Sequence, residues 1–336
     1  MMLTFKIRHG KDLSKELRQA KQVAEFALRT RSRSSKDVKH IGLKGVIANQ
    51  ILRKYSCDKR AKQVKRVKLA VPGQSIKFDK ENREIKISLL DLTMPYQFRN
   101  DFKKINQIEL GNEYAYVSVT IEEPAVTPVT NYIGVDRNTT GHCVVIANPA
   151  TGKVLKLGKS AEHTHKKYSK LRRKFQKAGE LGKLKAVKRR EHNIIKDLNH
   201  KISKKVVEVA KENNCGIRME KLEGIRKTKK QTRSFRYSLN SWSFYQQQSM
   251  VDYKAKLQGV PTFYDEPAFT SQVCSRCGLL GVRSGKEFEC PGCGHVDHAD
   301  SNASFNIALG SERMSRLNAE RDAFNGRTDA PREATA

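Results

Sequence analysis

The chain has 336 residues, 38% of them hydrophobic and 30% charged, and this length allows two or three domains with separate cores. Lys and Arg outnumber Asp and Glu by 66 to 35, which gives a formal charge of +31. Such an excess repels itself unless a polyanion neutralises it, so we expect a nucleic-acid partner rather than a generic basic surface. A membrane is a poorer partner because the sequence shows no lipidation signal and no long apolar segment. The first residues contain no signal-peptide core, which favours a cytoplasmic location.

The N-terminal part begins with one strand-like segment and then turns helical and basic. Residues 3–7 alternate as an edge strand does, whereas residues 11–65 carry apolar stripes at helical spacing. The second of these stripes predicts a helix over residues 45–55. We assign the stripes to a helix–helix core, and we expect the basic residues between them to touch phosphate: Arg29, Arg31, Arg33 and Lys36.

From residue 67 to residue 123 the period changes to two, and strands are expected at 76–79, 84–87 and 114–121. We therefore predict a small β-barrel, formed by residues 1–10 and 67–126, that is interrupted by a helical insert over residues 11–66. The Pro-containing segment 122–128 is the best linker in the chain, so the main domain boundary is placed there.

The second half opens with three predicted antiparallel strands, at 131–136, 141–146 and 154–157. Asp136 lies at the end of the first, on the face opposite Ile133 and Val135. Three consecutive antiparallel strands with such an Asp are typical of the beginning of an RNase H-like fold.

Residues 166–190 contain twelve basic residues opposed only by Glu180. A solvated helical hairpin would explain the pattern, but charge this one-sided favours contact with a nucleic-acid backbone. The expected contact residues are Lys166, Lys167, Lys170, Arg172, Arg173, Lys174, Arg189 and Arg190.

A core helix over residues 193–211 and a short strand over 215–220 follow, and this strand places Glu220 on the face opposite Ile217 and Met219. A second helix is expected over 242–257, capped by Ser241, before a final strand at 260–264. Between them lies a basic loop whose expected phosphate contacts are Lys229, Lys230 and Arg233.

Two CxxC pairs separated by twelve residues predict a zinc ribbon over residues 269–295, with the ligands Cys274, Cys277, Cys290 and Cys293. Four thiolates at this spacing close a tetrahedral Zn²⁺ shell with no open position, which indicates a structural site rather than a redox-active one. The pairs also fit a reducing compartment better than a disulfide framework. His295 and His298 are surplus to a complete four-cysteine shell.

Asp136, Glu220 and Asp300 have the order of an RNase H-type acidic site: first strand, later strand, C-terminal helix. Mg²⁺ prefers carboxylate and water oxygens, and two such ions about 3.5–4 Å apart can activate a water and stabilise the leaving oxygen of a phosphodiester. Asp297 is a rival for the third position, on a helix expected to begin near it. Asp300 is favoured because it stands in the Asp-x-Asn-Ala context.

Four motifs resemble the signature set of TnpB, the RNA-guided nucleases of insertion sequences and relatives of compact type V CRISPR effectors. They are Ile133-Gly134-Val135-Asp136, Met219-Glu220-Lys221-Leu222, Thr270-Ser271-Gln272-x-Cys274-Ser275-x-Cys277-Gly278 and Asp300-Ser301-Asn302-Ala303-x-x-Asn306-Ile307. They span residues 131–310, whereas the N-terminal third matches only in layout. The tail 311–336 resembles nothing in the family and is expected to be disordered.

The resemblance implies an α+β multidomain chain: a wedge barrel with an inserted recognition helical bundle, then a RuvC-type nuclease domain (131–268 and 296–310) carrying the zinc ribbon. It implies an RNA-guided DNA endonuclease with Asp136, Glu220 and Asp300 as catalytic residues holding two Mg²⁺, one structural Zn²⁺, a noncoding guide RNA and a double-stranded DNA target beside a short motif. An RNA-guided repressor and an RNase H-superfamily transposase are the alternatives. The oligomeric state stays open between monomer and dimer.

Overall fold

The computed structural model describes residues 1–222, 243–265 and 270–310, and the chain divides into two compact units, Met1–Glu123 and Pro124–Ala336. This division falls inside the Pro-containing segment 122–128. Three expectations lie outside the described residues: the basic loop with Lys229, Lys230 and Arg233, the helix cap at Ser241, and the disordered tail. No helix in the described part of the chain is long and apolar enough to cross a membrane.

The first unit contains two antiparallel sheets. The larger has the strand order β1-β7-β6-β2 and consists of β1 (Met2–Arg8), β7 (Tyr114–Thr120), β6 (Lys104–Leu110) and β2 (Leu69–Pro72). The smaller consists of β3 (Lys77–Asp79), β4 (Glu84–Ile87) and β5 (Leu92–Pro95). The first strand pairs with β7 along its full length, from Met2 opposite Thr120 to Arg8 opposite Tyr114. The chain thus returns to its first strand as expected, whereas closure into one barrel stays a prediction.

The helices between β1 and β2 are α1 (Ser14–Thr30) and α2 (Gly45–Ser56), with a 3-10 turn, η1 (Ser35–Ile41), between them. The predicted stripes are confirmed, since Val23, Ala27, Ile47 and Ile51 are fully buried. The helical pattern expected to run to about residue 65 is wrong in its extent. The last helix, α2, ends at Ser56, close to the end predicted for the helix over residues 45–55, and Arg31 ends α1 with a left-handed conformation (φ 59°).

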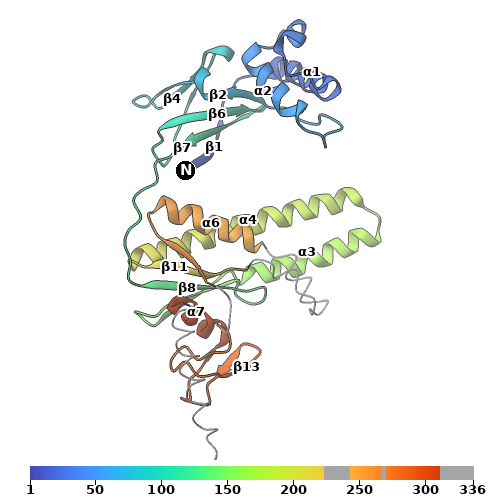
Figure 1. Cartoon of the computed structure of the whole chain (residues 1–336). Coiled ribbons are helices and arrows are strands. Elements are labelled where there is room, and N and C mark those ends of the chain that lie inside the picture. Colours follow the sequence, from blue (N-terminus) through green and yellow to red (C-terminus); the bar gives the residue numbers. More distant parts are fainter. Residues whose placement is uncertain (223–242, 266–269, 311–336) are drawn as a thin grey trace, which may run out of the picture. The chain divides into compact units, whose positions relative to one another are not determined.

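The second unit is built on a five-stranded sheet of order β10-β9-β8-β11-β12. Figure 1 shows α4 and α6 on one side of β8 and β11, and α7 on the other. The strands β8 (Tyr132–Arg137), β9 (Val144–Asn148) and β10 (Lys153–Leu157) are consecutive and antiparallel, as predicted. The strands β11 (Gly216–Glu220) and β12 (Thr262–Asp265) continue the sheet parallel to β8.

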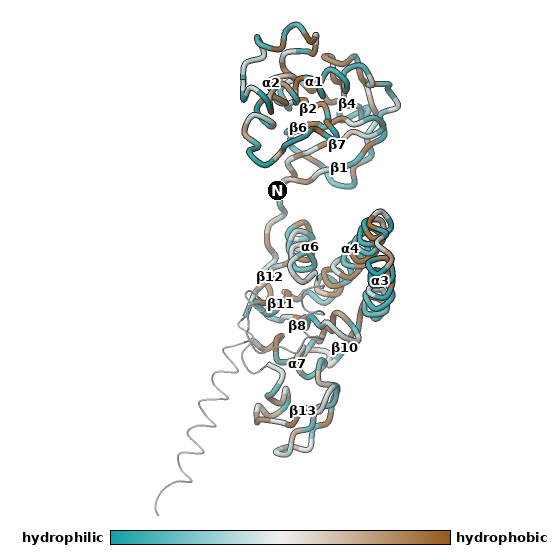
Figure 2. Tube along the Cα trace, turned by 90° about the vertical axis from the view of Figure 1, so that its right-hand side faces the viewer, coloured by the Kyte–Doolittle hydropathy of each residue, from teal (hydrophilic) through white to brown (hydrophobic). Residues whose placement is uncertain are grey.

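One face of this sheet is covered by α4 (Leu181–Glu212) and α6 (Phe244–Leu257). Ile133, Val135, Ile217 and Met219 point into this layer, which confirms the facing predicted from strand parity. The predicted helix 193–211 is wrong at its start, because α4 begins twelve residues earlier. The basic run 166–190 is therefore divided between α3 (Ser160–Lys177) and the first third of α4, which pack as a hairpin that Figure 2 shows mainly in hydrophilic colours.

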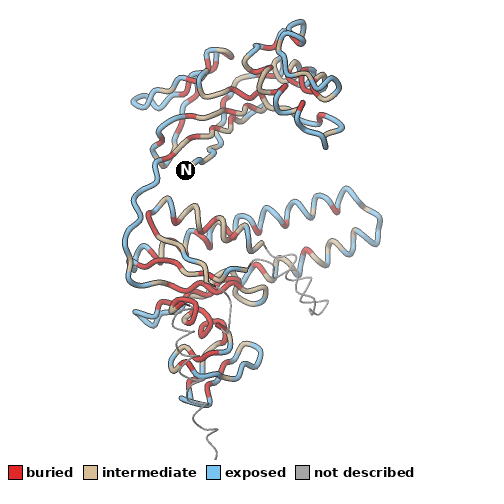
Figure 3. Tube along the Cα trace, viewed as in Figure 1, coloured by how far each residue is buried: buried red, intermediate tan, exposed pale blue. Residues whose placement is uncertain are grey.

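The opposite face of the sheet is covered by one short helix, α7 (Ala299–Leu309). Nearly every residue of α7 is buried, including the polar residues Asp300, Asn302, Ser304 and Asn306, and Figure 3 shows the helix almost wholly in red. A helix that is buried all round and half polar must find specific partners for its polar groups. These partners define the candidate site.

Candidate active site

Asp136 and Glu220 end two neighbouring parallel strands. In the register of β8 and β11, Val135 lies beside Met219, so that Asp136 and Glu220 occupy the next position of the two strands. Side chains alternate along a strand, and both carboxylates therefore leave the sheet on the face opposite the apolar layer. This is the face that α7 covers.

A glycine in β8 lets α7 approach the sheet closely enough to add a third carboxylate. A Cβ at Gly134 would lie 1.9 Å from the Ser304 carbonyl oxygen and 2.5 Å from the Ala308 nitrogen, so only glycine fits beneath the helix. The Ser304 hydroxyl also donates to the Val145 carbonyl of β9, over 3.0 Å. These contacts fix α7 with its first turn, which carries Asp300, near Asp136.

The electrostatics of Asp136 show that the three carboxylates share one neighbourhood. Burial, followed by the negative charge of Glu220, raises the pKa of Asp136 to about 7, and the charge of Asp300 acts in the same direction. The Asn138 amide opposes this shift by donating to Asp136 over 2.8 Å. The three acids are separated by 84 and 80 positions in the chain, yet the tertiary structure brings Glu220 and Asp300 close enough for their charges to act on Asp136, although the oxygens of the three do not all lie within 4.8 Å of one another.

Glu220 is held by groups that the sequence did not single out. Its carboxylate accepts a hydrogen bond from the Thr270 hydroxyl, over 2.5 Å, and its backbone carbonyl accepts one from the Arg137 guanidinium. Thr270 opens the motif that continues into the first cysteine pair. The strand that carries Glu220 is therefore tied directly to the start of the cysteine region.

Asp300 is almost completely buried, with 2% of its side chain exposed, and two cations face it. The Lys286 ammonium lies 2.6 Å from Oδ2, and the Arg283 guanidinium lies 3.4 Å from Oδ1. His298 is the N-cap of α7, where its Nδ1 accepts from the Asp300 backbone N–H over 3.3 Å. Burial, followed by the charge of Lys156, lowers the pKa of His298, which keeps the ring neutral for this role.

The expectation that Asp297 lies at the beginning of the helix is wrong. Asp297 belongs to β15 (Val296–His298), where it pairs with Phe288, and α7 begins only at Ala299. Its carboxylate accepts from the His298 backbone N–H and lies 3.9 Å from His295. Asp300 is the acid whose charge acts on Asp136.

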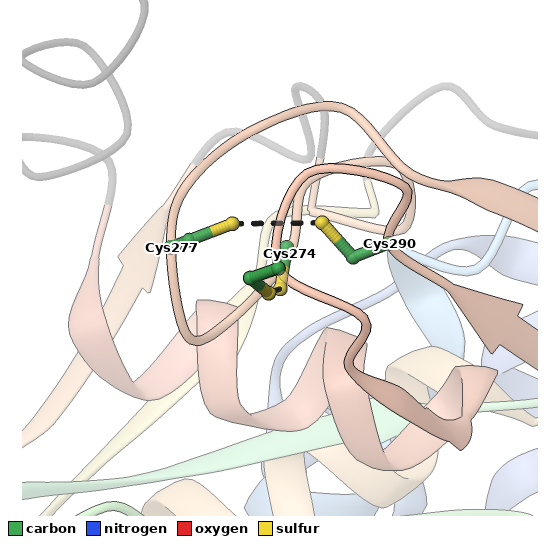
Figure 4. Close-up of side chains that lie close together, drawn as sticks. Cys274, Cys277 and Cys290 are labelled. Atoms are coloured by element: carbon green, nitrogen blue, oxygen red, sulfur yellow. Dashed lines mark hydrogen bonds between the residues drawn. The ribbon is translucent and has the colours of Figure 1, made fainter.

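The four predicted zinc ligands converge on one point (Figure 4). In the part of the chain that the structure describes, they are the single group in which three or more ligating atoms all lie within 4.8 Å of one another. Cys274 and Cys293 Sγ are 3.7 Å apart, and Cys277 and Cys290 Sγ are 3.5 Å apart. Zinc–sulfur bonds of about 2.3 Å in a tetrahedron require sulfur–sulfur distances of about 3.8 Å, so these thiols fit Zn²⁺.

The two cysteine loops repeat the same local geometry. Gly278 (φ 80°) donates to the Cys274 carbonyl, and Gly294 (φ 69°) donates to the Cys290 carbonyl, each over 2.9 Å. A left-handed residue after each pair is what glycine accepts without strain, so both turns can be tight. His295 lies near the loops but outside the cysteine group.

Two asparagines of α7 connect the helix to the entry of the cysteine region. Asn302 accepts from the Ser275 backbone N–H and donates to the Val273 carbonyl, over 2.9 and 2.8 Å. Asn306, one turn later, donates to the carbonyls of Thr270 and Val273. The Asp-x-Asn-Ala-x-x-Asn spacing therefore places one acid toward the sheet and two amides toward the metal-binding loops. The sequence indicated the motif but not which of its side chains faces the sheet and which face the metal-binding loops.

The described basic residues fall into two groups. Arg31 donates to three backbone carbonyls at the end of α2, and Arg172 forms an ion pair with the buried Glu191 of α4. These two are engaged within the protein. The others are exposed, although Lys166 pairs with Glu162 and Arg33 donates to Cys57 Sγ: Arg29, Arg33, Lys36, Lys166, Lys167, Lys170, Arg173, Lys174, Arg189 and Arg190.

Parts of this chain are similar in sequence to known proteins. The Cas12f1-like TNB domain family matches residues 244–307. A TnpB-like protein of Methanocaldococcus jannaschii is 36% identical over 151 residues, which are 43% of this chain and 54% of that protein. A CRISPR-associated endodeoxyribonuclease Cas12f1 of Sulfoacidibacillus thermotolerans is 38% identical over 115 residues, 33% of this chain and 26% of the relative.

The aligned segments thus cover between about a quarter and about half of these relatives. Among solved structures, a Cas12f1–sgRNA–target DNA complex contains a chain similar to this one at a TM-score of 0.45 and 17% identity. The alignment covers 92% of this chain and 99% of that chain.

Proposed function

We propose that this chain, which is similar over part of its length to TnpB-like and Cas12f1 proteins, is an RNA-guided DNA endonuclease whose acidic site is formed by Asp136, Glu220 and Asp300. The observation that supports this most directly is the packing of α7 on Gly134, which adds Asp300 to a pair of acids at the ends of β8 and β11. The strand order β10-β9-β8-β11-β12, with three antiparallel strands followed by two parallel ones, supports the proposal of an RNase H-like (RuvC) domain.

The donor set fits two Mg²⁺ ions, because hard divalent cations prefer carboxylate oxygens and because the mutual repulsion of three acids is relieved by positive charge. When bound, such a pair of ions activates a water and stabilises the leaving oxygen of a phosphodiester. Asp136, Glu220 and Asp300 would hold them. The cysteine centre would hold a structural Zn²⁺ that fixes the loops beside α7.

The protein's own contribution is the placement of these acids. The Thr270 hydroxyl orients Glu220, the Asn138 amide orients Asp136, and the two asparagines of α7 tie Asp300's helix to the cysteine loops. Each acid is therefore set by a different element of the fold. Rigid support of this kind keeps the groups within the narrow tolerances that catalysis requires.

Guide RNA and target DNA are the proposed partners, in keeping with the +31 charge and the family. The exposed basic residues of α3 and α4 would hold the backbone of a guide–target duplex, while base pairing supplies most of the specificity. The helical insert of the first unit carries further exposed Arg and Lys residues for the same purpose.

The test is to purify the chain after co-expression with the flanking sequence of its genetic element. We expect a discrete RNA to copurify, and the complex to cut a matched plasmid beside a short motif in the presence of Mg²⁺. Bare protein without RNA would exclude the RNA-guided function. Binding without cutting would favour a repressor, and joined rather than cleaved products would favour a transposase.

A further inference from the structure

The two cations that face Asp300 come from the cysteine region. Lys286 lies at the turn between β13 (Val282–Ser284) and β14 (Glu287–Glu289), and Arg283 lies in β13. This hairpin continues from β14 directly into Cys290, one of the four cysteines. Lys286 also acts on Asp136, whose pKa its charge lowers against the stronger opposing effects of burial and Glu220.

The backbone of the hairpin tip is fixed to α7, whereas its charged side chains extend toward solvent. The Lys286 carbonyl accepts from the Ala299 backbone N–H over 2.8 Å, one residue before Asp300. The side chains of Lys286 and Arg283 keep 37% and 34% of their surface exposed, while Asp300 keeps 2%. The carboxylate is therefore shielded from solvent, whereas each partly exposed cation can turn away from it by side-chain rotation alone.

The Lys286 ammonium occupies a position that a metal ion would need. A divalent ion coordinated by a carboxylate lies about 2.0–2.6 Å from the oxygen, and the ammonium already lies 2.6 Å from Asp300 Oδ2. Two cations cannot share that lone pair, because at this separation their repulsion is large in a buried setting. Amine and metal ion are therefore alternatives at Oδ2.

We propose that Lys286, assisted by Arg283, is an exchangeable counter-ion of Asp300 that a divalent metal ion must displace. This counter-ion pair keeps the buried carboxylate neutralised while metal is absent, and it lowers the affinity of the acidic site for metal. After exchange, both side chains carry their charge at the edge of the site, where a nucleic-acid phosphate approaches. The inference rests on the proposed metal-dependent nuclease site.

The experiment measures Mn²⁺ binding to the zinc-loaded full chain by electron paramagnetic resonance of the free ion. Asp300→Asn defines the part of the binding that depends on Asp300. Lys286→Gln should bind Mn²⁺ about tenfold more tightly than the wild type, because a nearby positive charge is removed. Arg283→Gln should give a smaller increase, because its distance to Asp300 is longer. Lys286→Arg restores the charge and should restore an affinity close to that of the wild type.

Lys153→Gln is the matched control, because it removes one exposed lysine from β10 of the same unit. It should leave Mn²⁺ affinity unchanged. A second readout is the melting temperature: without divalent metal, Lys286→Gln should melt below Lys153→Gln, and saturating Mn²⁺ should remove the difference. Zinc content confirms that each variant has folded around its cysteine centre.

The outcomes separate the two proposals. Equal Mn²⁺ affinity in Lys286→Gln and the wild type, with Asp300-dependent binding present in both, overturns the counter-ion role and leaves the nuclease site standing. Mn²⁺ binding that is the same in Asp300→Asn and the wild type overturns the metal site and the counter-ion role together.

Discussion

At the residue scale, Asp136 shows how a catalytic arrangement costs stability. A carboxylate that is buried beside two others keeps its proton to an unusually high pH, and its pKa rises to about 7. In the unfolded chain the same group ionises near its ordinary value of 3.8. Between these two values the folded state binds more protons than the unfolded state, so the stability of the metal-free protein falls as the pH rises through this window.

Asp136→Asn should remove this loss of stability at rising pH. The amide oxygen can still accept from Asn138, while the charge is gone. Without divalent metal, we expect the variant to be more stable than the wild type by about 4 kcal/mol at pH 7.5 and by only about 1 kcal/mol at pH 4.5, because the pKa of Asp136 is raised from 3.8 to about 7. Urea unfolding at the two pH values measures this, and an identical pH dependence in both proteins would contradict it. The same variant should lose DNA cutting while it retains DNA binding.

At the scale of elements, the contact between α7 and β8 depends on a missing side chain. Gly134→Ala places a methyl group against the backbone of the helix, so the helix must move away from the sheet. We expect a loss of stability of about 2–3 kcal/mol, typical of overpacking, together with loss of cutting.

Gly182→Ala is the matched control for this contact. It lies in α4, and a Cβ there meets no atom within 4 Å, so the change should be neutral or slightly stabilising. Thermal melts compare the two variants. Equal melting temperatures would show that the packing of α7 against β8 does not require glycine at position 134.

The cysteine centre and α7 form a second pair of coupled elements. Cys274→Ser should release the zinc that we expect at about one ion per chain, because a structural site requires all four thiolates. Loss of the metal should also increase amide hydrogen exchange in α7, because the side chains of Asn302 and Asn306 form hydrogen bonds with the loops that the metal organises. Cys57→Ser, an exposed cysteine of the first unit, should keep both zinc and protection. Full zinc content in Cys274→Ser would disprove the ribbon.

At the scale of the whole molecule, the basic residues differ in how available their charges are to a nucleic acid. Lys170 and Arg173 are exposed on α3, whereas Lys201 and Lys204 of α4 are paired with Asp197 and Glu208 four residues away. Unpaired charges release counter-ions when they meet phosphate, and each contact contributes about 0.7–0.9 to the salt dependence of binding.

Lys170→Gln combined with Arg173→Gln should therefore weaken nucleic-acid binding equally for all sequences and flatten its dependence on salt. Lys201→Gln combined with Lys204→Gln, which removes the same charge, should have a much smaller effect. Fluorescence anisotropy with a labelled RNA at several salt concentrations measures both. Equal effects of the two pairs would show that net charge alone, and not the α3 surface, governs binding.

Part of this organisation follows from local pattern. The cysteine spacing, the alternation that puts Asp136 and Glu220 on the polar face, and the stripes of α1 and α2 depend on near neighbours in the chain. Such features are read from the sequence because side-chain periodicity and turn geometry are local properties. The start of α4 was misjudged, because dense Lys and Arg hide apolar periodicity.

By itself, the sequence identified the three acids and the four thiols as candidate ligands, and it indicated that Asp136 and Glu220 lie at the ends of strands. Only the tertiary structure decided which other groups contact these acids and support the helix that carries Asp300. Thr270 reaches Glu220 across 50 positions, Gly134 makes room for α7, and Lys286 faces Asp300 from the hairpin of the cysteine region. Gly134 and Thr270 stand in recognised motifs, but these partners are distant from their targets in the chain, so no local pattern shows what each of them contacts. They become distinct only when burial removes water and leaves each carboxylate to the charges and donors beside it.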